Sequence, residues 1–152
     1  MFEDVFGLPA HPLIVHTAVI FIPLLAVGAV VFGVVPRVRP QLGWAVALLS
    51  VVAPIAAFAA KASGEAFIDR NFGGEVPEGP LGAKLDEHMS YANPLLYSTI
   101  ALGVSTLLLV YSSLRLGKVA TAILTVITVV LAVAAGFYAV RSGHTGAVAV
   151  WS

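Results

Sequence analysis

Four long apolar segments constrain this chain more than any other feature of its sequence. They span residues 13–35, 42–61, 94–114 and 119–140, and Lys61 at the end of the second is their only charged residue. A helix needs roughly 20 apolar residues to cross the hydrocarbon core of a bilayer. Only 11% of the residues are charged, whereas soluble domains carry about 25%. We therefore predict a single all-α domain over residues 1–152, an integral membrane four-helix bundle embedded in the lipid bilayer.

The charges on the links between these segments predict the orientation. The short links 36-PRVRP-40 and 115-RLGK-118 carry basic residues and no acid, whereas every acidic residue lies beyond the opposite ends of the spans. Short cytoplasmic loops carry an excess of Lys and Arg. We predict extracytoplasmic N- and C-termini in a multi-pass protein of the bacterial cytoplasmic (inner) membrane. The start, MFEDVFG, lacks the basic region of a signal peptide, so we expect the first segment to remain as a span.

Composition also excludes several classes of function. The formal net charge is zero, which argues against a nucleic-acid partner. The chain has no cysteine, which excludes disulfides, thiolate metal sites, iron–sulfur clusters and covalently attached c-type haem. Serine and threonine are scattered through the spans with no base nearby in the sequence, so no catalytic nucleophile is predicted, and whether the protein is an enzyme stays open.

All four histidines are predicted to lie at one membrane face. His11 and His16 are at the outer end of the first span, His88 precedes the third, and His144 follows the fourth. Spans joined by short links are antiparallel neighbours in a bundle. Such a bundle can bring His16, His88 and His144 together.

His16 is the strongest candidate of the four. Pro12 disfavours helical geometry at His11, so we expect His11 in the entry turn and His16 about one turn inside the helix. If both were helical, they would lie about 140° apart around the axis and could not hold one small ion together. Ionisable groups within a span usually face the bundle interior. We predict that His16 is a ligand or a polar-network member, and that His11 is either an interface residue or an accessory to the site.

His88 and Glu65 have both functional and plain interpretations. Tyr91 shares a helical face with His88 at a spacing of three, although His88 can equally be a solvated loop residue. Glu65 can be an oxygen ligand, or can accept a hydrogen bond from an imidazole N–H and so fix the orientation of the ring. In the plain interpretation, its carboxylate is simply solvated.

The last span ends in a glycine-rich stretch around His144. Gly136 and Gly143 are seven residues apart on one helical stripe, which permits close approach of another helix or of a flat ligand. Gly143 and Gly146 can equally mark a helix end.

The landmarks 11-HPLIVH-16, 62-ASGEA-66, His88 and 142-SGHTGAVAVW-151 resemble an uncharacterised bacterial family of small four-span membrane proteins. That family opens approximately HPLHPxxVHFP and ends its last span in a TGxxGG-like pattern with a short aromatic tail. This chain departs from it at Pro9-Ala10, at His16-Thr17-Ala18 and at Gly146-Ala147. Some relatives are fused to Rieske-type or cytochrome-c-type domains, so the resemblance implies electron transfer at the outer face.

The leading hypothesis is a b-type haem protein that transfers electrons to a redox partner protein. His16 and His88 would be the axial pair, with His144 or His11 as an alternative ligand or a propionate partner. Arg141 and Lys84 are cations that can pair with propionates, and Tyr91 accompanies His88.

Two other hypotheses stay open. One is a compact zinc or copper site formed by His16, His88, His144 and Glu65, which suits those metals by donor type. The other is a non-catalytic accessory subunit of a membrane complex, or a homo-oligomer, in which the histidines form an internal polar cluster.

Overall fold

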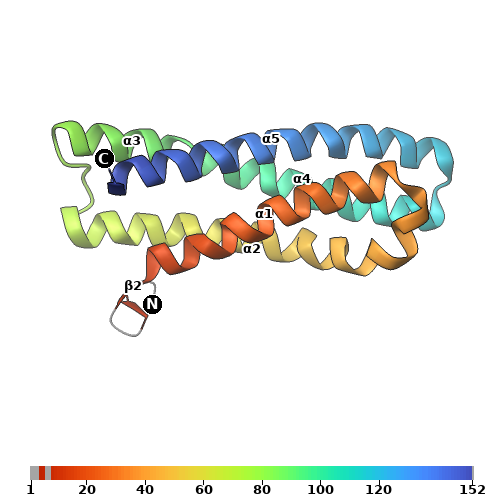
Figure 1. The fold of residues 1–152 in the computed structure, drawn as a ribbon, viewed down its shortest axis with the longest axis horizontal. Coiled ribbons are helices and arrows are strands. Elements are labelled where there is room, and N and C mark those ends of the chain that lie inside the picture. The colour runs from red at the N-terminus through yellow and green to blue at the C-terminus, as the bar shows by residue number, and fades with distance from the viewer. Residues whose placement is uncertain (1–3, 6–7, 152) are drawn as a thin grey trace.

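The computed structural model describes residues 4–5 and 8–151 (Figure 1). A short hairpin precedes the helices and pairs Asp4 with Pro9 and Val5 with Leu8 in antiparallel fashion. The elements in chain order are β1 (Asp4–Val5), β2 (Leu8–Pro9), α1 (Ala10–Val34), the 3₁₀ helix η1 (Pro36–Val38), α2 (Arg39–Phe72), α3 (Pro80–Ser90), α4 (Ala92–Arg115) and α5 (Lys118–Trp151).

The four long helices form a bundle with both ends of the chain at the same end of it (Figure 1). Helix α1 packs against α2 and α5, and α4 packs against the same two helices, while the short α3 lies on α5. Within the described residues, four helical segments are long and apolar enough to cross a membrane. The predicted all-α bundle of four apolar helices is confirmed, and the direction in which it crosses the membrane stays a prediction.

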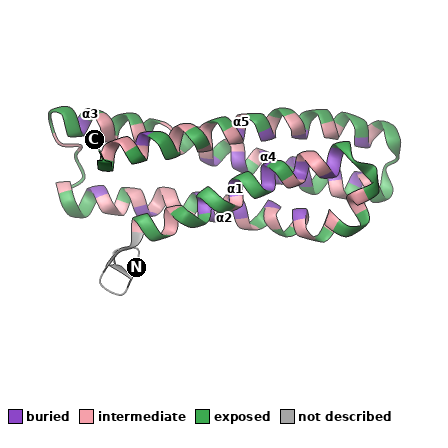
Figure 2. Ribbon diagram, viewed as in Figure 1, coloured by how far each residue is buried: buried purple, intermediate pink, exposed green. Residues whose placement is uncertain are grey.

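Buried and exposed residues alternate along the four long helices (Figure 2). The buried stripe of α1 includes Ala18, Ile22, Leu25, Ala29 and Phe32. On the outside lie large apolar side chains, such as Val27 with 63% and Val133 with 68% of their surface exposed. Small residues inside and branched ones outside are typical of helices that pack within lipid.

Helices α2 and α5 continue beyond the ends predicted from hydropathy. The polar segment after Lys61 keeps helical geometry until Gly73, whose φ of 68° ends α2 in the left-handed conformation. Its N–H donates to the Asp69 carbonyl at 3.1 Å, which closes the helix end. Gly143 and Gly146 do not end a helix, because α5 runs through both. These extensions, with α3, build the end of the bundle that carries His11 and His88, here called the histidine end.

Helices α2 and α4 approach closely at Gly103. A Cβ at this position would lie 2.5 Å from the carbonyl oxygen of Ser50 and 3.1 Å from Cγ of Pro54. Pro54 has no N–H to give the carbonyl four residues before it, so α4 covers the place where α2 lacks its own hydrogen bond. Only glycine permits this contact without displacing backbone.

Arg39 closes the opposite end of the bundle. Its Nε donates to the carbonyl of Phe32 at 3.0 Å and its Nη2 to that of Gly33 at 2.7 Å. These carbonyls belong to the last turn of α1, which has no intrahelical donors for them. The arginine therefore both caps α1 and fixes the short link to α2.

Candidate functional site

Two histidines from opposite halves of the chain lie at the histidine end. His11 lies in the first turn of α1 and His88 in the last turn of α3. Both are half-buried, and they lie close enough to interact electrostatically. This pair differs from the predicted one, which joined His88 to His16.

His11 is held by a hydroxyl and a glycine of α2. Its Nδ1 lies 2.8 Å from Oγ of Ser63, which is fully buried and also bonds the Ala60 carbonyl at 2.8 Å. The neighbouring Gly64 leaves room for the ring, since a Cβ there would lie 3.1 Å from its Cε1. Phe67, one turn further, packs at 6.2 Å between ring centroids. The imidazole is therefore fixed by contacts on two sides.

His88 is held in the same way by α5. Its Nδ1 lies 3.2 Å from Oγ1 of Thr145, which is buried and donates to the carbonyls of Arg141 at 2.9 Å and Ser142 at 3.2 Å. A Cβ on Gly146, the next residue, would lie 3.0 Å from Cε1 of His88. Each half of the chain thus supplies one imidazole and one hydroxyl–glycine dipeptide that supports it.

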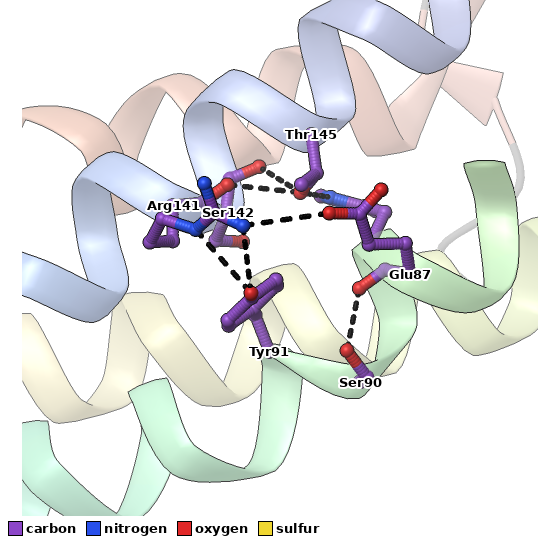
Figure 3. A network of polar contacts seen from close by, with 7 residues as sticks. Glu87, Ser90, Tyr91, Arg141, Ser142 and Thr145 are labelled. Carbon is purple, nitrogen blue, oxygen red and sulfur yellow. Dashed lines mark hydrogen bonds and ion pairs between the residues drawn. The ribbon is translucent and has the colours of Figure 1, made fainter.

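A cation, Arg141, lies one turn before Thr145 on α5 and contacts Tyr91 and Glu87 (Figure 3). Arg141 donates to the Tyr91 hydroxyl from Nη2 at 2.9 Å and from Nε at 3.3 Å, and its Nη2 lies 3.5 Å from Oε1 of Glu87. The guanidinium carbon is also 5.2 Å from the Tyr91 ring centroid. Tyr91 and Arg141, both predicted as site residues, are therefore brought together, and Tyr91 follows His88 by three residues. Lys84 lies on the same helix as His88 and is half-buried.

His16 is not where the sequence prediction placed it. It is exposed on the outside of α1, and its Nδ1 lies 2.5 Å from the Pro12 carbonyl of its own helix. The reason is that α1 begins at Ala10. Pro12 is tolerated there, because the first N–H groups of a helix have no intrahelical partner. Both histidines are then helical and about 140° apart, so with His11 turned inward, His16 faces outward.

His144 and Glu65 also lie apart from the pair. His144 is exposed and lines one end of an apolar groove of about 600 Å³ between α1 and α5, together with Gly136 and Gly143. Glu65 forms an ion pair with Lys61, one turn before it on α2. Among residues 4–5 and 8–151, no three His, Asp or Glu side chains form a group that could hold a metal ion. The compact site of His16, His88, His144 and Glu65 is therefore not formed.

Sequence reasoning missed the residues that support the two rings. Ser63-Gly64 and Thr145-Gly146 were visible in the sequence, but the two glycines at the end of α5 were interpreted as a packing stripe or a helix end. The available signal was the repetition of a hydroxyl–glycine dipeptide after the second predicted span of each half.

Comparison with known proteins adds no family to this description. No family model, curated protein or solved structure matches the chain.

Proposed function

We propose that this membrane protein binds a b-type haem at its histidine end, with His11 and His88 as the axial ligands, and that it transfers electrons. The observation that carries the proposal is the pair itself. Two half-buried imidazoles from different helices lie at the same end of the bundle, and each ring is anchored through Nδ1 to a buried hydroxyl.

The number of donors favours haem over a compact metal site. A porphyrin supplies four of the six ligands of its iron, so two protein imidazoles are sufficient. Zinc sites take three or four protein ligands, and the described residues offer no group of three. Pairing His88 with His11 also replaces the expected pairing with His16, whose outward position removes it from the site.

The surroundings of the pair suit the two parts of a haem. Gly64 and Gly146 let the two rings lie directly against the helix backbone, which keeps each imidazole in a fixed place. Arg141, held by Tyr91, is a cation placed to pair with a carboxylate such as a propionate. When bound, the haem would supply one-electron redox chemistry, and the chain would set its potential through ligand identity, burial and hydrogen bonding.

Location and partner follow from the predicted orientation. If the basic links are cytoplasmic, the site faces outward from the bacterial inner membrane, and its electron donor or acceptor is a protein on that side. The resemblance to a family with members fused to redox domains supports, by analogy, electron transfer with a protein on the outer side.

Hemin titration of the detergent-purified protein tests the proposal, with absorption spectra recorded before and after reduction. We expect a Soret band and sharp reduced bands at one hemin per chain. His11→Ala and His88→Ala should each abolish or strongly weaken the complex, whereas His16→Ala and His144→Ala are matched controls that should leave it intact.

The same samples distinguish the alternatives. Stoichiometric zinc or copper in the purified protein without hemin binding would favour a metal site completed by a second copy or a partner. Absence of both metal and hemin binding would contradict the cofactor proposal and favour an accessory subunit.

A further inference from the structure

We propose that Ser63 and Thr145 are positioning residues that hold both imidazoles as the Nδ1–H tautomer, so that both Nε2 atoms are the donors to the ligand. This inference deepens the proposed function and rests on it for the identity of the ligand. It specifies a ligand class: a metal centre with two open coordination positions, one for each half of the chain.

At His11, the number of available protons determines the direction of the hydrogen bond. Ser63 has one hydroxyl proton, and its Oγ lies 2.8 Å from two atoms, the Ala60 carbonyl oxygen and Nδ1 of His11. A carbonyl oxygen can only accept, so the hydroxyl proton goes to Ala60. The bond to the ring then needs a proton from Nδ1. In the opposite arrangement, the lone pairs of Oγ and the carbonyl oxygen would face each other at 2.8 Å.

The same count holds at His88. Thr145 directs its single proton to the carbonyls of α5, those of Arg141 at 2.9 Å and Ser142 at 3.2 Å. Its Oγ1 can therefore only accept from Nδ1 of His88 at 3.2 Å. Because a neutral imidazole carries one N–H, Nε2 of each ring keeps its lone pair.

The chemical consequence concerns donor strength as well as direction. A ligand imidazole that donates its other N–H to an oxygen is fixed in tautomer and orientation and becomes a more basic donor. Here both oxygens are hydroxyls backed by a helix carbonyl, one on α2 and one on α5. The two halves of the chain thus supply one supported imidazole each, and a haem iron would accept both as donors.

The first test reads the tautomers without any haem. Long-range ¹H–¹⁵N spectra of the full chain, labelled at histidine and kept at neutral pH, distinguish Nδ1–H from Nε2–H. We expect Nδ1–H for His11 and His88. Ser63→Ala should release His11 alone and Thr145→Val should release His88 alone, each towards the Nε2–H form that a free histidine side chain prefers in water. Ser63→Thr and Thr145→Ser should keep the native tautomers.

The second test uses the hemin-loaded protein. Loss of such a supporting partner typically weakens metal binding about 10–100-fold, so we expect weaker hemin binding in Ser63→Ala and Thr145→Val. We also expect a more positive midpoint potential, because a less basic imidazole stabilises the ferric state less. The conservative variants should restore both properties, which a purely structural effect of the alanine would not predict.

The outcomes separate this inference from the proposed function. Nε2–H tautomers for either histidine in the unmodified protein would overturn the positioning role, whatever the hemin titration shows. Nδ1–H tautomers that depend on Ser63 and Thr145, in a protein that binds no hemin, would support the positioning role and contradict the haem.

Discussion

Alanine substitution at Gly146 is the prediction that the structure specifies most closely. A Cβ at this position would lie 3.0 Å from Cε1 of His88, closer than ordinary van der Waals contact. At Gly136 and Gly143 of the same helix, a Cβ would meet nothing within 4 Å. The three positions therefore compare the same substitution on one helix with and without the ring beside it.

The expected changes in stability follow from the different helix preferences of glycine and alanine. Glycine within a helix costs roughly 0.5–1 kcal/mol relative to alanine. Gly136→Ala and Gly143→Ala should therefore raise the thermal midpoint by up to about 4 °C, since 1 kcal/mol corresponds to about 2–4 °C in a chain of this size. Gly146→Ala should lose this gain, because His88 must move by a few tenths of an ångström and its bond to Thr145, already 3.2 Å long, is stretched.

Thermal unfolding in detergent, combined with hemin titration, measures both effects. We expect Gly146→Ala to be less stable than Gly143→Ala and to bind hemin more weakly, with unchanged hemin binding in the two controls. Equal stability and equal hemin affinity in all three variants would refute the contact between Gly146 and His88 on which the site is built.

Three further predictions concern other parts of the bundle. Gly103→Ala should lower stability by about 1–3 kcal/mol, because its Cβ would lie 2.5 Å from a backbone oxygen that cannot move aside; an unchanged thermal midpoint would contradict the close packing of α2 and α4. Arg39→Ala should cost on the order of 1–3 kcal/mol by leaving two carbonyls of α1 without their donor, as read from thermal unfolding, with Arg37→Ala as the control. Arg141→Leu should weaken hemin binding more than Tyr91→Phe does, since the first removes the cation and the second only the hydroxyl that holds it; the reverse order in hemin titration would mean that the cation does not pair with a propionate.

The spans were predictable because hydrocarbon thickness fixes the length of apolar sequence that a helix needs. The residues at which the helices end could not be predicted in the same way. Residues after Lys61 are more polar but still favour a helix. The apolar segment therefore ends at Lys61, whereas the helix continues to Gly73. The glycines of α5 were ambiguous for a similar reason, because glycine ends a helix only where the backbone turns left-handed, and neighbouring packing decides that.

The rotation of α1 about its axis could not be predicted. This helix is apolar on all sides, so its sequence has no polar stripe to distinguish the inner from the outer face. The choice between His11 and His16 depends on that rotation alone. The buried stripe of α1 mixes small residues such as Ala18 and Ala29 with large ones such as Phe32. Residue type therefore does not mark the inner face, and only the packing places His11 inside.

The support of the two rings depends on contacts across the whole chain. Ser63 lies 52 residues from His11, and Thr145 lies 57 residues from His88. No local pattern predicts such pairings, and only the packing of the helices brings them together. The sequence could indicate which end of the bundle carries the site, but not which two of its four histidines form it.

The most direct test of the central claim is the electron paramagnetic resonance spectrum of the ferric, hemin-loaded protein. Two imidazole ligands from His11 and His88 predict a low-spin spectrum that becomes high-spin in His11→Ala and in His88→Ala and stays low-spin in His16→Ala. A high-spin spectrum in the unmodified protein, or a low-spin spectrum that survives removal of both His11 and His88, would contradict the account.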